Sequence, residues 1–208
     1  MGFDNIIEQI ESAGFIYLGS FHPEAEQTLM LIGNAGPRMW ENFTTSRGAS
    51  NTTMDEWTRL TITDLADILG VTALFPFDRP PYPFLSWAEK TGETFISPIG
   101  LSIHPRYGLW HGYRAALIFE GALDLPPATP EKSPCITCID KPCLTTCPVD
   151  AFSPEGYDVP ACITHIKTTD NPDCLELGCR ARRACPIGQD FHYLPQQARF
   201  HMSAFIKA

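Results

Sequence analysis

The sequence predicts an α+β domain followed by a small cysteine-rich domain. The chain has 208 residues, which is enough for one full domain and a short second one. All eight cysteines lie between Cys135 and Cys185, and none precedes them. A proline-rich stretch, Asp124–Pro134, has the composition of an extended connector. We therefore expect one domain over residues 1–130 and another over 131–208.

Helical and strand patterns alternate in the first domain, as in an α+β sandwich. Asp4 is positioned to cap a helix that buries Ile6, Ile7 and Ile10 and ends at Gly14. Gly33–Gly36 predicts a tight turn. The other predicted elements are strands over 15–21, 28–32, 71–75 and 113–119, a helix from Pro37 through Trp40 and Phe43, an amphipathic helix over 55–69 that ends at Gly70, and a short helix over 83–90.

The C-terminal tail, Phe191–Ala208, carries Phe200, Phe205 and Ile206 at helical intervals. This pattern predicts a helix that packs on the core. The second interpretation is that the tail forms a homodimer contact.

Composition limits the partners and the compartment. The formal net charge is −9, so we expect a surface that repels nucleic acid and anionic membranes and suits a cationic partner. No apolar stretch is long enough to span a membrane, and the first residues lack the pattern of a signal peptide. We expect a cytoplasmic protein with no membrane partner. In a reducing cytoplasm, eight cysteines favour metal binding over disulfides.

The cysteines form two groups that each end in Cys-Pro. They are Cys135-x2-Cys138-x4-Cys143-x3-Cys147-Pro148 and Cys162-x11-Cys174-x4-Cys179-x5-Cys185-Pro186. Bacterial ferredoxins use the run C-x2-C-x2-C-x3-C-P, whose fourth cysteine ligates the other cluster. The first group matches this run with two extra residues before Cys143. The second group is longer but has the same ending.

This spacing predicts two 4Fe–4S clusters and therefore electron transfer. Under the ferredoxin scheme one cluster takes Cys135, Cys138, Cys143 and Cys185, and the other takes Cys147, Cys162, Cys174 and Cys179. Zinc is the alternative, but structural zinc sites use Cys-x2-Cys pairs and the chain has one such pair.

The cysteine region resembles the diferredoxin module of epoxyqueuosine reductases and reductive dehalogenases. The similarity is carried by Ala161–Thr164 and by the Gly178-Cys179 and Cys185-Pro186 ending. The resemblance implies a small bacterial-type ferredoxin domain whose clusters feed electrons to a cobalamin. The longer loops before Cys143 and between Cys174 and Cys185 depart from that pattern.

A second run, from Ser102 to Arg114, is rich in aromatic, histidine, arginine and glycine residues. Such a cluster is typical of a ligand-binding wall, and it is also typical of a loop that packs its aromatics into a core. The run looks like one found in the cblC-type cobalamin-trafficking proteins. Asp78–Pro80 before it and the proline-rich segment Asp124–Pro127 after it resemble segments of the same family. That resemblance implies a nitroreductase-like fold that binds cobalamin base-off and removes its upper axial ligand with reduced flavin or glutathione.

The resemblance implies a corrinoid pocket with named residues: His104, Arg106, Tyr107, Gly108, Trp110 and Arg114. Gly108 would admit the macrocycle, the two aromatics would contact its face, and the arginines would bind its polar substituents. His104 or His111 would either ligate cobalt or form structural hydrogen bonds. Gly33–Gly36 would line the same cleft or form only a turn.

Three arginines, Arg180, Arg182 and Arg183, lie inside the second cysteine group. They would hydrogen-bond a cluster sulfur or raise the cluster's potential by adding positive charge, or they would form a solvated basic strip.

The leading hypothesis is an iron–sulfur oxidoreductase that takes electrons from a redox partner protein and reduces or processes a bound corrinoid. The first alternative is a ferredoxin-type carrier that docks a partner without a corrinoid. The second is a corrinoid-dependent reductase of an organic substrate, and a flavin in place of cobalamin is a further option. The absence of GxGxxG argues against a Rossmann nicotinamide site.

Overall fold

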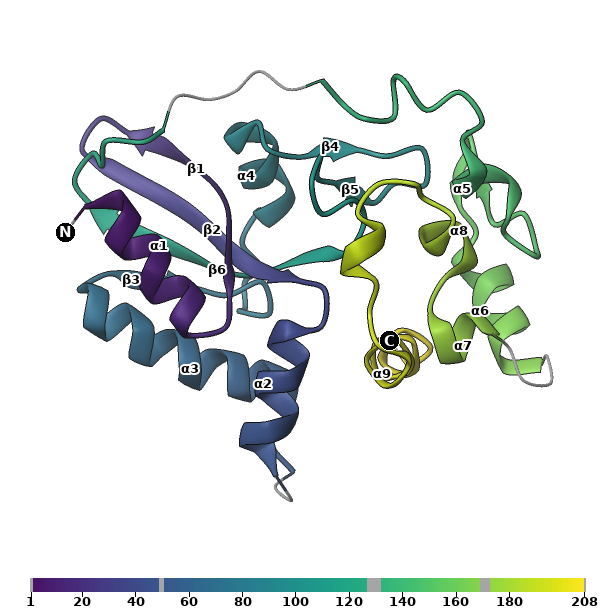
Figure 1. The fold of residues 1–208 in the computed structure, drawn as a ribbon, viewed down its shortest axis with the longest axis horizontal. Coiled ribbons are helices and arrows are strands. Elements are labelled where there is room, and N and C mark those ends of the chain that lie inside the picture. Colours follow the sequence, from purple (N-terminus) through teal and green to yellow (C-terminus); the bar gives the residue numbers. More distant parts are fainter. Residues whose placement is uncertain (1, 49–50, 127–131, 169–172, 208) are drawn as a thin grey trace. The chain divides into compact units, whose positions relative to one another are not determined.

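The computed structural model describes residues 2–48, 51–126, 132–168 and 173–207. Residues 127–131, the centre of the predicted connector, lie outside this range. The chain forms two compact units, Met1–Thr94 with His111–Glu131 and Phe95–Trp110 with Lys132–Ala208 (Figure 1).

The segment Phe95–Trp110 groups with the cysteine region, whereas the sequence pattern predicts that it belongs to the first domain. The reason is packing, because Ile103 and Leu109 share a buried cluster with Cys143 and Cys185. The two units are therefore not continuous in sequence.

The first unit is built on an antiparallel sheet with the strand order β1-β2-β6-β3 (Figure 1). The strands are β1 (Ile16–Glu24), β2 (Gln27–Ala35), β3 (Thr72–Leu74) and β6 (His111–Glu120). β2 lies between two neighbours and is buried along almost its whole length. A continuous apolar run is expected of a strand covered on both faces.

The turn predicted at Gly33–Gly36 is confirmed only at its end: Gly33–Ala35 continue β2 and pair with β6, and the chain turns at Gly36, which adopts φ 63°. A glycine is needed at position 33 because the backbone of the neighbouring strand leaves no room for a side chain. A Cβ atom at this position would lie 2.0 Å from the carbonyl oxygen of Gly112 on the neighbouring strand.

Four helices belong to the first unit: α1 (Phe3–Ser12), α2 (Arg38–Arg47), α3 (Met54–Leu69) and α4 (Phe84–Thr91). The first three pack against the sheet, and α4 packs against β1. The predicted Asp4 cap is wrong, because Gly2 is the N-cap and Asp4 lies in the first turn of α1. The helix predicted to end at Gly70 is confirmed, since Gly70 adopts the left-handed conformation with φ 67°.

The second unit has short elements: β4 (Phe95–Ile96) paired with β5 (Ser102–Ile103), α5 (Pro142–Thr145), β7 (Phe152–Ser153) paired with β8 (Gly156–Tyr157), α6 (Val159–Thr168), α7 (Asp173–Leu177), α8 (Arg180–Arg183), a 3₁₀ turn at Gln189–Phe191, and α9 (Pro195–Phe205). α9 confirms the helix predicted in the C-terminal tail. It packs against α7, and Phe205 stacks near Tyr157 with ring centroids 6.4 Å apart.

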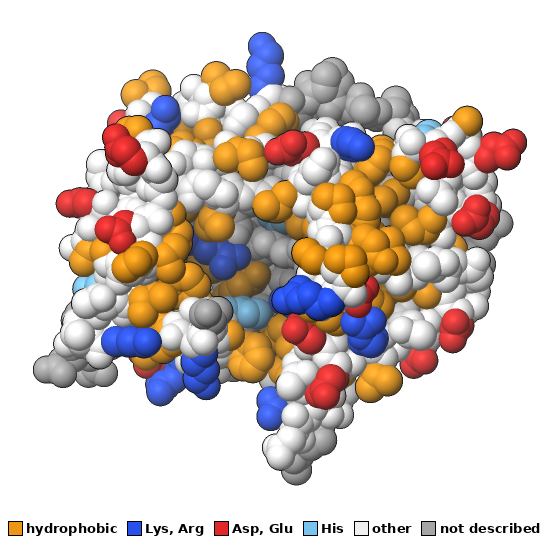
Figure 2. Space-filling view, turned by 180° about the vertical axis from the view of Figure 1, so that it is seen from behind, with side chains coloured by type: hydrophobic (Ala, Val, Ile, Leu, Met, Phe, Trp, Pro, Cys, Tyr) orange, Lys and Arg blue, Asp and Glu red, His pale blue; other side chains and the backbone are white. Residues whose placement is uncertain are grey.

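Carboxylate side chains are spread over the surface in Figure 2, in keeping with the net charge of −9. In the described parts of the chain, every helix is too short or too polar to cross a lipid bilayer.

Candidate metal centre

The structure collects the eight cysteines into two sets of four. Cys135, Cys138, Cys143 and Cys185 line one small cavity of about 20 Å³. Cys147, Cys162, Cys174 and Cys179 line a larger cavity of about 260 Å³. This is the division that the ferredoxin spacing predicts. All eight are free thiols.

The first set joins residues that are distant in sequence. Cys143 lies in α5, and Cys185 follows α8. Burial raises the pKa of both thiols, and their proximity to Cys135 and Cys138 raises it further. Without a metal, repulsion between neighbouring thiolates keeps these buried thiols protonated. A bound metal ion replaces the protons and neutralises the thiolates, so the grouping favours metal binding.

The second set is contributed by the segment before β7 and by α6, α7 and the start of α8. Burial raises the pKa of Cys174 and Cys179, and Cys179 also interacts with the thiols of Cys147 and Cys162. Tyr157 hydrogen-bonds Cys162, and burial, followed by this bond, raises the pKa of the phenol strongly. The Tyr157 hydroxyl is thus the donor to sulfur.

Backbone amides are also directed at the thiols. The amide of Ala151 donates to Cys147 Sγ over 3.3 Å. Backbone groups of Arg180, Arg182 and Ile187 do the same for Cys174, Cys179 and Cys185 respectively. Hydrogen bonds from backbone amides to sulfur are one of the means by which proteins set the potential of iron–sulfur clusters.

Both cavities fit the donor chemistry of a 4Fe–4S cluster, which requires four thiolates. Among the described residues, no three His, Cys, Asp or Glu side chains are grouped closely enough to hold a single metal ion.

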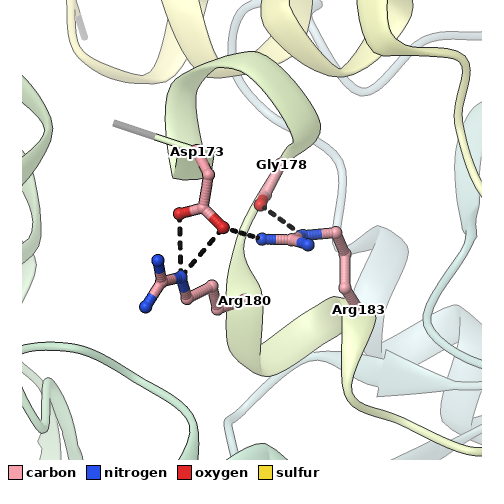
Figure 3. Close-up of polar contacts among 4 residues, drawn as sticks. All are labelled: Asp173, Gly178, Arg180 and Arg183. Carbon is pink, nitrogen blue, oxygen red and sulfur yellow. Dashed lines mark hydrogen bonds and ion pairs between the residues drawn. The ribbon is translucent and has the colours of Figure 1, made fainter. Parts of the chain in front are cut away.

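Asp173 organises two of the three arginines of the second group (Figure 3). Its carboxylate accepts hydrogen bonds from Arg180 and Arg183, and Arg183 also donates to the Gly178 carbonyl over 3.1 Å. Burial alone would raise the pKa of Asp173, but the two guanidinium groups outweigh it and lower that pKa. The Arg180 and Arg183 side chains thus bind a carboxylate, while the Arg180 backbone donates to Cys174 and the Arg180 side chain is 49% exposed.

The third arginine, Arg182, ties α8 to the His104–Trp110 segment. Its Nε donates to the Leu109 carbonyl over 2.7 Å. The guanidinium lies 4.5 Å from the ring centre of Trp110 and 4.6 Å from that of Tyr193. A cation close to two aromatic rings is a stabilising arrangement.

Five of the six predicted corrinoid residues lie in the second unit, and Arg114 lies in the first. Trp110 is 1% exposed, and its ring packs against His192 and Tyr193, which are side chains of the same unit. Tyr107 meets Phe191 edge-on at 4.9 Å. The aromatic pair therefore helps to build the second unit.

Gly108 also lies in a backbone contact within the second unit. It adopts φ 57°, and a Cβ atom there would lie 2.0 Å from the carbonyl oxygen of Ile187. The backbone that lies close to Gly108 is the stretch after Cys185, and the predicted approach to a corrinoid macrocycle stays a prediction.

His104 has a structural role in a tight turn. Its Nδ1 accepts the backbone amide of Arg106 at 3.0 Å, and that of Tyr107 at 3.4 Å. Burial, and then the positive charge of Arg106, lowers the pKa of His104 to about 4. This nitrogen is therefore occupied as an acceptor in the turn.

In the first unit, Arg114 and the predicted Gly33–Gly36 segment meet. Arg114 Nε donates to Asn34 Oδ1 over 3.0 Å, and Asn34 is 1% exposed. His111 is buried on β6 with its ring 5.7 Å from that of Tyr113. These residues lie at the end of β2 and the start of β6, which pair with each other.

No protein-family profile and no curated protein matches the chain. Among solved structures, an epoxyqueuosine reductase bound to an epoxyqueuosine-modified tRNA-Tyr stem loop is similar, with 18% identity and a TM-score of 0.56 over 94% of this chain and 68% of that one. The Bacillus subtilis epoxyqueuosine reductase gives 17% identity and a TM-score of 0.53 over the same shares.

The C. elegans B12-trafficking protein CblC gives 15% identity and a TM-score of 0.52 over 98% of this chain and 94% of that one. The two resemblances noted in the sequence are thus confirmed at the level of the fold. The chain has a mixed α/β fold that it shares with epoxyqueuosine reductase and with the CblC B12-trafficking protein.

Proposed function

We propose that this chain is an iron–sulfur electron-transfer protein that reduces or processes a bound corrinoid. The observation that carries the proposal is the collection of eight cysteines into two cavities of four thiols each. Four thiolates are the ligand set of a 4Fe–4S cluster, and such clusters transfer single electrons. Under this proposal the second unit is a small ferredoxin-type domain.

The corrinoid is the proposed destination of the electrons. Support comes from the shared fold, because one solved neighbour is a B12-trafficking protein. In the first unit, the candidate contact is the Arg114–Asn34 pair, which combines a cation with an amide on adjacent strands. Both groups suit the amide substituents of a corrinoid. A corrinoid held by Arg114 and Asn34 would supply a reducible cobalt centre, whose reduction is the chemistry of upper-ligand removal.

Iron and labile sulfide analysis tests the first step. Anaerobically purified protein should hold about eight iron atoms per chain, and fewer than about seven would contradict two complete clusters. Zinc in place of iron would refute the electron-transfer function directly.

An anaerobic titration with hydroxocobalamin tests the second step. We expect a visible spectral change that reports base-off binding. Arg114→Ala should weaken that binding roughly tenfold, which corresponds to about 1.4 kcal/mol. Arg38→Ala is the matched control, since Arg38 is exposed on the same unit and donates to the Glu11 carbonyl.

The outcomes separate the alternatives. No spectral change with wild-type protein would favour a plain ferredoxin-type carrier. A spectral change on titration with FMN, and none with cobalamin, would favour a flavin as the cofactor. Equal affinity in wild-type protein and Arg114→Ala would refute the pocket assignment.

A reductase that acts on an organic substrate is the second candidate, and the fold shared with epoxyqueuosine reductases favours it. One of those structures contains a tRNA stem loop, so the predicted lack of a nucleic-acid partner stays a prediction. Binding of a tRNA stem loop by this acidic chain would support the second candidate.

A further inference from the structure

Cys174 and Cys179 depend on two very short helices. Cys174 lies in α7, which has 5 residues, and Cys179 caps α8, which has 4. Between them Gly178 adopts φ 85°. Helices of this length have no stability of their own in water. Other interactions must fix the spacing of these two thiols.

The carboxylate of Asp173 bridges the two helices (Figure 3). It begins α7, and it accepts hydrogen bonds from Arg180 at 2.8 and 2.9 Å and from Arg183 at 2.5 Å. These arginines begin and end α8. A single side chain thus joins the residue before Cys174 to both ends of the helix that follows Cys179.

One arm of the bridge is better protected than an ordinary surface ion pair. The side chains of Asp173 and Arg183 are 31% and 26% exposed, and Arg183 is also anchored on the Gly178 carbonyl, whereas the Arg180 side chain is 49% exposed. Charged groups in such a network lose less energy to solvent screening than isolated exposed pairs do.

We propose that Asp173 is a positioning residue that holds Cys174 and Cys179 at the spacing required by the second cluster. The inference rests on the proposed function only in assuming that the cysteines bind 4Fe–4S clusters. It does not depend on the corrinoid.

The test compares Asp173→Ala with Glu176→Ala. Glu176 lies on the same helix and pairs with Arg199 at 2.8 Å, but that pair is more exposed and joins α7 to α9. Both proteins are reconstituted anaerobically with iron and sulfide. Iron content is then measured, and the reduced proteins are analysed by electron paramagnetic resonance.

Asp173→Ala should lose the second cluster and keep the first, so iron should fall from about eight to about four atoms per chain. The magnetically coupled signal of two reduced clusters should become that of one isolated cluster. Glu176→Ala should match the wild type. Asp173→Glu keeps the carboxylate and should restore part of the second cluster.

The retained first cluster reports that the unit is folded. Full iron content and an unchanged coupled signal in Asp173→Ala would overturn the inference. It would also be overturned by loss of both clusters together, or by equal losses in Glu176→Ala. Wild-type protein without iron–sulfur clusters would instead refute the proposed function itself.

Discussion

At the residue scale, Gly108 illustrates what a sequence can predict and what it cannot. The family resemblance predicts that Gly108 lets backbone approach a corrinoid macrocycle, and in the structure its backbone lies close to other protein backbone. Its partner is Ile187, which is distant in sequence, so local pattern could not identify it. The same holds for Arg182, whose contacts with Leu109 and Trp110 join segments that only the folded chain brings together.

Replacing Gly108 should destabilise the second unit more than replacing Gly100. Both glycines have positive φ, but a Cβ at Gly108 meets backbone at 2.0 Å, while a Cβ at Gly100 meets nothing within 4 Å. Gly100→Ala should cost about 1 kcal/mol from backbone strain alone. Gly108→Ala should cost at least about 2 kcal/mol more, because backbone must move. Denaturant unfolding of the two variants measures the difference, and equal losses would contradict the close contact.

His104 should make stability depend on pH. Its pKa is lowered to about 4 in the folded chain, while an unfolded chain protonates near pH 6.5. Between these values the unfolded state binds more protons, so this contribution is complete above about pH 6.5 and is lost as the pH falls toward 4. Protonation also removes the Nδ1 acceptor that holds the turn.

Comparison with His104→Asn isolates that contribution, because an asparagine oxygen can accept the same amide without titrating. We expect the wild type to lose stability faster than the variant between pH 6.5 and 4. Parallel curves from thermal unfolding would show that His104 does not titrate in this way.

At the element scale, prediction succeeded where the signals are local. The amphipathic pattern and Gly70 locate α3 closely, although Leu60 and Ile68 are each 65% exposed. Prediction failed at β2, where Gly33 suggests a turn but serves strand pairing. A glycine has the same sequence signature in both cases, and only the neighbouring strand decides between them.

The capping box of α3 should contribute measurable stability. Thr53 Oγ1 accepts the Glu56 amide at 3.2 Å, and Glu56 Oε2 accepts the Thr53 amide at 2.8 Å. Thr53→Ala removes the cap and should cost about 1 kcal/mol, whereas Thr53→Ser keeps it. Chemical denaturation should rank the variants in that order, and an unaffected Thr53→Ala would exclude a stabilising cap.

At the scale of the whole molecule, the eight cysteines were the most predictable feature. Their spacing alone gave the division into two sets that the two cavities reproduce. The placement of Phe95–Trp110 was not predictable, because it rests on contacts of Ile103 and Leu109 with the distant Cys143 and Cys185. The corrinoid pocket assigned by resemblance is divided accordingly, with Arg114 in the first unit and the other five residues in the second.

The division of the cysteines predicts which substitutions act together. Cys143→Ala and Cys185→Ala should remove the same cluster, because both thiols line the first cavity. Cys147→Ala should remove the other cluster although Cys147 is close to Cys143 in sequence. Electron paramagnetic resonance of the reduced variants shows which of the two clusters each variant keeps. Identical spectra for Cys143→Ala and Cys147→Ala would contradict the pairing.

The central claim is that the clusters deliver electrons to a corrinoid. The most direct measurement reduces the protein anaerobically, removes the excess reductant, and mixes the protein with a small amount of hydroxocobalamin while the visible spectrum is recorded. We predict that the cobalamin is reduced and that the clusters lose as many electrons as the cobalamin gains. An unchanged cobalamin spectrum beside clusters that stay reduced would contradict the claim.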